Sequence, residues 1–128
     1  MSQALIISTL AMKNWAVVGA TDDPAKFGYR IWRVLKDRGY RVAAINPSLE
    51  SIEGDPVYKS ILDVPEKPEV VDMVVNPRTG LRVMQEIAQA GIKYVWMQPG
   101  TRSQEIRDFA AANGIDLIED CVLIQVDR

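Results

Sequence analysis

A short apolar run, Trp15–Gly19, stops at a glycine, and a polar loop then leads into a helical pattern that starts near Gly28. This order of strand, glycine-containing loop and helix is typical of α/β folds in which backbone N–H groups at a helix N-terminus hold a phosphate. Further along the chain, apolar runs of about four to six residues alternate with helical patterns that end at a glycine. The alternation indicates a parallel sheet covered by helices on both faces.

Five of the apolar runs are predicted as strands of one sheet, at 15–19, 40–45, 70–75, 94–97 and 115–118. Helices are predicted between them at 29–38, 79–89 and 103–112. The proline-rich stretch 48–68 is interpreted as a loop with a short strand at Val57-Tyr58 and a turn of helix at 60–64, and 122–126 as a short terminal segment. Because crossovers between parallel strands are right-handed, we expect an α/β fold with a single doubly wound, mainly parallel five-stranded sheet, a Rossmann-like domain.

The length of the chain and its first residues limit the remaining architecture. A chain of 128 residues, 48% of them apolar, suits one compact core, so we predict a single domain over 1–128. The apolar stretch at the start has no positive charge before it and is too short to span a bilayer. We therefore predict an N-terminal helix over 1–13 rather than a targeting segment, and no membrane partner.

The charge and the cysteine content argue against several classes of protein. A net charge of -2 gives no sign of the basic surface that nucleic acid requires, so no nucleic-acid partner is expected. Cys121 is the one cysteine and the chain has no histidine, which excludes an internal disulfide and a cysteine-based zinc site. A single cysteine is typical of a reducing compartment, and we expect the protein in the cytoplasm.

The first loop departs from the common nucleotide-binding motifs. An NAD fingerprint needs a second glycine where the chain has Thr21, and an acidic residue where the second strand ends in Asn46-Pro47. A Gly-Lys-Ser/Thr sequence, which a P-loop needs, does not occur. The residues therefore disfavour NAD binding and ATP hydrolysis of the P-loop type.

Two cations follow the first glycine and are candidates for phosphate contacts. Lys26 lies in the loop and Arg30 in the helix after it, and both side chains suit phosphate recognition. Ordinary surface charge is the alternative for both. The nearby carboxylates of Asp22 and Asp23 oppose phosphate binding unless they cap the loop.

Motifs along most of the chain resemble one family. The most specific is Trp96-Met97-Gln98-Pro99-Gly100, together with a cysteine after the last predicted strand. The other matching segments are 16–21, 28–30, 39–42, 46–47, 63–65, 71–74 and 119–121. On these residues, 13–126 resembles the small stand-alone CoA-binding proteins, whose domain is similar to that of the succinyl-CoA synthetase alpha subunit. Relatives often have Val-Phe-Arg after the fourth strand and proline after the cysteine, whereas this chain has Val75-Asn76-Pro77-Arg78 and Val122.

The resemblance implies a Rossmann-like domain that binds coenzyme A or an acyl-CoA at the carboxyl ends of the strands. In that family picture the loop from Gly19 to Arg30 cradles the pyrophosphate, and Asn46-Pro47 with the loop after Val75 flanks the adenosine. Gln98 is a further candidate, because it is a polar side chain at a strand end. The site residues expected are Gly19, Ala20, Thr21, Lys26, Tyr29, Arg30, Asn46, Pro47, Asn76, Arg78, Gln98 and Gly100.

The expected function is non-catalytic binding of CoA or an acyl-CoA, in a sensing or regulatory role. The synthetase reaction needs a phosphorylatable histidine in a further domain, and this chain has no histidine. One alternative is an NAD(P)-linked or acyl-CoA enzyme that uses Cys121 or carboxylates. Another is an interaction protein whose nucleotide cleft is vestigial. Self-association and a partner enzyme are both compatible with so small a domain.

Cys121 and the tryptophans each allow a functional and a structural interpretation. Cys121 could form a mixed disulfide with the CoA thiol, but the acidic neighbours Glu119 and Asp120 argue against the thiolate that this needs, and an inert cysteine is favoured. Trp96 could stack on an adenine, although a core position is favoured for it. Trp15 and Trp32 are predicted to be packing residues.

Overall fold

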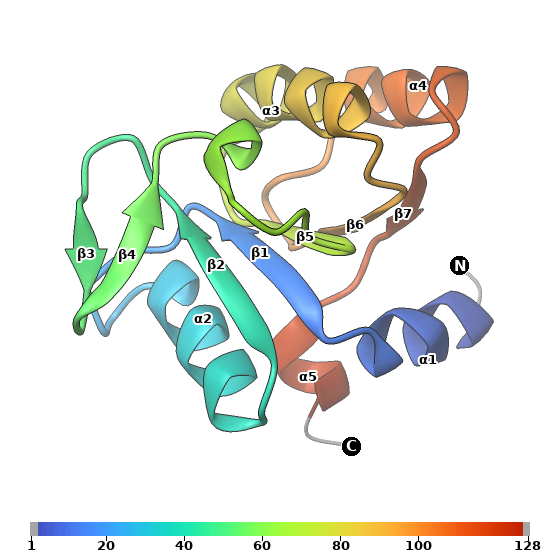
Figure 1. The fold of residues 1–128 in the computed structure, drawn as a ribbon. Helices are drawn as coiled ribbons and strands as arrows, with labels where there is room; N and C mark the ends of the chain where they lie inside the picture. The colour runs from blue at the N-terminus through green and yellow to red at the C-terminus, as the bar shows by residue number, and fades with distance from the viewer. Residues whose placement is uncertain (1–2, 127–128) are drawn as a thin grey trace.

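The computed structural model describes residues 3–126, and its centre is a sheet of seven strands in the order β3-β4-β2-β1-β5-β6-β7 (Figure 1). All neighbouring strands are parallel except β3, which is antiparallel to β4. The strands are β1 (Asn14–Val18), β2 (Arg41–Ile45), β3 (Ser51–Ile52), β4 (Asp55–Tyr58), β5 (Val70–Met73), β6 (Tyr94–Met97) and β7 (Asp116–Ile118). The predicted doubly wound, mainly parallel fold is confirmed.

The predicted number of five strands is wrong, because the loop after β2 forms a hairpin that adds β3 and β4 to the edge of the sheet. Its turn is Glu53-Gly54, with φ of 50° and 87°, and a two-residue turn with both φ positive suits the twist of paired strands. The predicted strand at Val57-Tyr58 is the second half of β4. Only two residue pairs join β3 to β4, so the sequence carries little strand pattern there.

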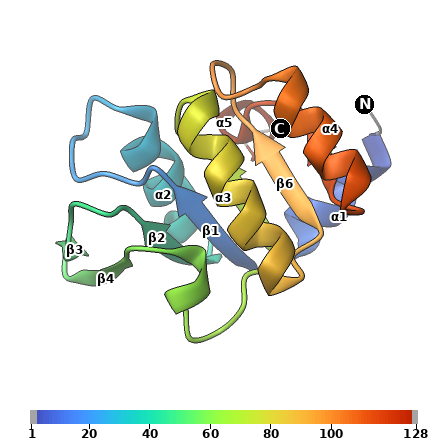
Figure 2. The same ribbon diagram turned by 90° about the horizontal axis from the view of Figure 1, so that it is seen from above.

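Helices cover both faces of the sheet (Figure 1). On one face lie α3 (Pro77–Ala90) and α4 (Gln104–Ala112), which run side by side when seen from above in Figure 2. On the other face lie α1 (Gln3–Ala11), α2 (Phe27–Asp37) and α5 (Val122–Val126), so the predicted terminal segment is a short helix. A 3₁₀ turn, η1 (Ile61–Asp63), follows β4. The helix predicted over 1–13 is α1, and positions 1 and 2 lie outside the described residues.

Local signals in the sequence explain where the long helices begin and end. The side chain of Asn76 accepts a hydrogen bond from the Thr79 N–H at 3.0 Å, and proline follows it at the first helical position of α3. The same helix ends at Gly91, whose φ of 77° is left-handed. Ser103 caps α4 by accepting from the Ile106 N–H at 3.2 Å.

The three tryptophans form part of the core under α1, α2 and α5, as predicted. Trp15, Trp32 and Trp96 are each at most 1% exposed. The indole N–H of Trp96 donates to the hydroxyl of Thr9 at 2.9 Å, and that of Trp15 donates to the Met12 carbonyl at 2.8 Å. The first bond attaches α1 to β6, and the second holds the residue after α1 against β1.

The order of the strands determines where a ligand can enter. From β1 the chain continues on one side to β2 and β4, and it then returns across β1 to add β5, β6 and β7 on the other side. The direction of winding therefore reverses between β1 and β5, and in open α/β sheets ligands bind outside the carboxyl ends of the strands at such a point. Within residues 3–126, no helix has the length and apolar character that crossing a bilayer requires.

Candidate functional site

A cleft of about 620 Å³ lies at the carboxyl ends of the central strands. Its floor is formed by Val18 and Gly19 at the end of β1 and by Ile45 at the end of β2. One wall holds Asn46-Pro47 and Lys59, and the opposite wall is a face of α3. A smaller hollow of about 310 Å³ lies at the amino ends of β1 and β2, where this fold does not bind ligands. The larger cleft is therefore the candidate site.

Two glycines allow the first loop to pass close to its neighbours. Gly19 has a φ of 97°, and a Cβ built on it would lie 2.5 Å from the carbonyl oxygen of Val74. A Cβ built on Gly28 would lie 2.0 Å from the carbonyl oxygen of Gly19. Neither position has room for a side chain. The loop after β1 therefore packs directly on the first turn of α2.

The first turn of α2 has no side-chain cap. Lys26 occupies the N-cap position, and no side chain there accepts a hydrogen bond from the first turn. Asp23 accepts from the Ala25 N–H at 3.0 Å, so one of the two loop carboxylates stabilises the loop, as the sequence allowed. Lys26 and Arg30 are both exposed, and the Arg30 guanidinium lies 5.7 Å from the centre of the Phe27 ring.

Asn46 connects the loop after β1 to the loop after β2. Its amide group donates to the Ala20 carbonyl at 2.8 Å, and its side-chain oxygen accepts from the Ser48 N–H at 2.8 Å. Ala20 itself is buried, and the Thr21 hydroxyl accepts from the Asp23 N–H at 3.3 Å. These contacts give the mouth of the cleft a defined shape.

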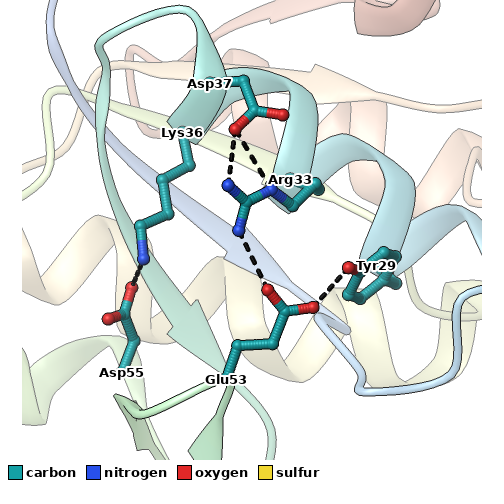
Figure 3. Close-up of polar contacts among 6 residues, drawn as sticks. All are labelled: Tyr29, Arg33, Lys36, Asp37, Glu53 and Asp55. Atoms are coloured by element: carbon teal, nitrogen blue, oxygen red, sulfur yellow. Dashed lines mark hydrogen bonds and ion pairs between the residues drawn. The ribbon is translucent and has the colours of Figure 1, made fainter.

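Tyr29 lies on α2 and points to the β3–β4 hairpin rather than into the cleft (Figure 3). Its hydroxyl donates to the carboxylate of Glu53, and this hydrogen bond raises the pKa of Tyr29 above its ordinary value. Arg33 also donates to Glu53, at 2.9 Å, and to Asp37 at 2.6 Å. An ion pair between Lys36 and Asp55 also links α2 to the hairpin. Together these side chains hold the hairpin against α2.

The face of α3 supplies lining residues that sequence reasoning missed. Asn76 caps this helix and Arg78 is exposed in its first turn, but neither lines the cleft. The residues that do are Thr79, Arg82, Val83, Gln85, Glu86 and Gln89, together with Val75 before the helix. Most of them follow a spacing of three or four residues, which marks one face of a helix. The sequence did contain this spacing of polar residues. It does not by itself indicate a binding site, because the polar face of a helix usually faces only solvent.

Gln98 and Gly100 follow β6 and do not line the cleft. Gln98 is 3% exposed; its amide group donates to the Cys121 sulfur at 3.2 Å, and its side-chain oxygen accepts from the Val122 N–H at 3.0 Å. Cys121 is half-buried and unpaired. Of the twelve predicted residues, the cleft thus brings together Gly19, Asn46 and Pro47. No group of three metal-ligating side chains occurs in the described part of the chain.

Known proteins share both the sequence pattern and the fold. The family described as CoA binding domain matches residues 13–127. The chain belongs to this family. An ADP-forming acetate–CoA ligase of Methanocaldococcus jannaschii is 35% identical over 81 residues, which cover 63% of this chain and 12% of the ligase. The matched part of the present chain therefore spans about an eighth of the length of the ligase.

Solved structures agree with the family assignment. A hypothetical protein from Pyrococcus horikoshii OT3 superposes with a TM-score of 0.95 at 30% identity, over 100% of this chain and 92% of the other. A dinucleotide-forming acetyl-coenzyme A synthetase of Ca. Korarchaeum cryptofilum superposes with a TM-score of 0.77 at 25% identity, over 89% of this chain and 27% of the synthetase. This CoA-binding domain thus resembles both a small protein and part of a much larger enzyme.

Proposed function

We propose that this CoA-binding domain protein binds coenzyme A or an acyl-CoA in the cleft and does not transform it. The observation that carries the proposal is the position of the cleft, which opens at the carboxyl ends of β1 and β2 beside the loop that starts at Gly19. Ligands of doubly wound sheets bind at this position. The family assignment supports CoA as the ligand.

The ligand is proposed to lie with its pyrophosphate against the loop from Gly19 to the start of α2. Ala20 and Thr21 offer backbone groups there, and Lys26 and Arg30 offer positive charge. The adenosine then extends past Asn46 and Pro47 into the cleft. The other predicted residues are proposed to shape or border the site: Tyr29, Asn76, Arg78, Gln98 and Gly100.

A binding role without catalysis is supported by the chemistry of the lining. Among the described residues that line the cleft, the ionisable side chains are those of Lys59, Arg82 and Glu86. These include neither histidine nor cysteine, the usual side chains for nucleophilic or acid–base work on a thioester. We propose a cytoplasmic protein that senses or carries CoA, or that serves a partner enzyme as a separate ligand domain.

Thermal melting of the purified protein with CoA, acetyl-CoA, NAD, NADP and ATP in parallel tests the proposal. A ligand present at a hundred times its Kd stabilises the protein by about 2.7 kcal/mol, which raises the Tm measurably. We expect a rise with CoA species alone and no turnover of acetyl-CoA. Turnover that disappears in Cys121→Ser would favour an enzyme, and no shift with any ligand would turn the search to protein partners.

A further inference from the structure

Two cations from different elements line the cleft. Lys59 follows β4 on one wall, and Arg82 lies on α3 on the other. Both are exposed, and neither forms an ion pair within residues 3–126. Their ammonium and guanidinium groups are therefore available to an anion that enters between the walls.

A hydrogen bond joins the segment that carries Lys59 to the helix that carries Arg82. The hydroxyl of Ser60, the neighbour of Lys59 in the chain, donates to the carboxylate of Glu86 at 2.5 Å. Glu86 lies one helical turn after Arg82 on the same face of α3, and all three residues Lys59, Arg82 and Glu86 line the cleft. Because Glu86 already binds Ser60, the lining has one engaged carboxylate and two free cations.

The rest of the cleft is suited to a flat apolar group next to these charges. Val18 and Ile45 lie at its floor, and Val75 and Val83 lie on the side of α3. An adenine ring can pack against such side chains, while its ribose stays near the polar mouth. A substituent on that ribose then comes within reach of cations on the walls.

We infer that Lys59 and Arg82 form a phosphomonoester site that recognises the 3′-phosphate on the ribose of CoA. The inference rests on the proposed function and names the feature by which the cleft selects CoA among adenine nucleotides. NAD, ADP and dephospho-CoA have no such group. A phosphomonoester carries up to two negative charges, so two unengaged cations neutralise it more fully than a single cation does.

Isothermal titration with CoA and with dephospho-CoA tests the inference directly. The wild-type protein is expected to bind CoA at least about tenfold more tightly than dephospho-CoA, because charge-assisted hydrogen bonds to the 3′-phosphate add this much affinity. Lys59→Ala and Arg82→Ala should each weaken CoA binding about tenfold. The affinity of each variant for dephospho-CoA should stay within about twofold of the wild-type value. Lys59→Arg should restore most of the preference for CoA. The matched control is Lys93→Ala, which should change neither affinity. Lys93 is an exposed lysine just before β6, at the amino edge of the sheet.

The outcomes separate this inference from the proposed function. Equal affinity for CoA and dephospho-CoA, or a preference that survives in both alanine variants, would overturn the phosphate site while CoA binding stands. If neither compound binds, both ideas fail. A preference for NADP over NAD that depends on the same two cations, without a preference for CoA, would assign the site to a 2′-phosphate instead and overturn the inference.

Discussion

Gly28 on α2 lies against the carbonyl oxygen of Gly19 at the end of β1, so closely that a Cβ on Gly28 would come within 2.0 Å of that oxygen. The atom in the way belongs to the backbone, so it cannot rotate aside as a side chain can. The contact joins the strand, the loop and the helix that together form the proposed pyrophosphate site.

Gly28→Ala is therefore expected to destabilise the protein and to weaken CoA binding. Overpacking against backbone costs about 1–3 kcal/mol or more, which thermal melting detects. Gly80→Ala is the matched control, since Gly80 is also a buried helical glycine, but a Cβ there meets the end of the Ile106 side chain at 3.3 Å. The free energy of unfolding of the control should lie within about 1 kcal/mol of the wild-type value, because the higher helix propensity of alanine offsets the tight contact. Equal behaviour of the two variants would contradict the packing argument.

Asp72 is a second site where a substitution has a defined outcome. It lies in β5 between Val17 and Trp96 of the neighbouring strands, fully buried, and neither carboxyl oxygen has a hydrogen-bond partner among the described residues. Burial raises the pKa of Asp72 well above its ordinary value of 3.8. The folded protein then keeps a proton that the unfolded chain releases, so stability falls as pH rises from about 4 toward the folded-state pKa.

Asp72→Asn removes this titration. The free energy of unfolding of the variant, relative to wild type, should therefore increase as pH rises from about 4, with a slope of up to about 1.4 kcal/mol per pH unit. Urea unfolding of both proteins across this pH range measures the difference. Parallel pH profiles would mean that Asp72 ionises normally in the folded state.

The hydrogen bond from Trp96 to Thr9 predicts how α1 is held. Thr9→Val keeps the shape of the side chain but leaves the buried indole N–H of Trp96 without its acceptor, at a cost of about 1–3 kcal/mol. Ser8→Ala, a change at the adjacent exposed hydroxyl, should alter stability by less than about 0.5 kcal/mol. Chemical denaturation compares the two. A Thr9→Val variant as stable as wild type would show that this bond does not anchor the helix.

The sequence was most informative where one local signal decided the structure. Glycines after helices and the apolar run before Gly19 predicted the central strands and long helices, because each depends on neighbours in the chain. The β3–β4 hairpin was missed as an addition to the sheet, because two short strands carry too little periodicity. Its position depends on contacts such as Arg33 with Glu53, which lie far apart in sequence.

The candidate site was only partly predictable for the same reason. Loop residues at strand ends, such as Asn46, can be placed from topology alone, because parallel strands end at one edge of the sheet. Lys59 and Arg82 reach the cleft because η1 and α3 pack together, and a single sequence does not reveal that packing. Gln98 has the polar character of a site residue, but its buried hydrogen bonds to Cys121 and Val122 hold the start of α5.

The most direct test of ligand binding in this cleft is to follow backbone amide NMR signals during titration with CoA. We predict the largest shifts at Gly19, Asn46, Lys59 and Arg82, around the cleft at the carboxyl edge of the sheet. Shifts confined to the hollow at the amino edge, near Asn14 and Arg41, would contradict this prediction, as would spectra that CoA leaves unchanged.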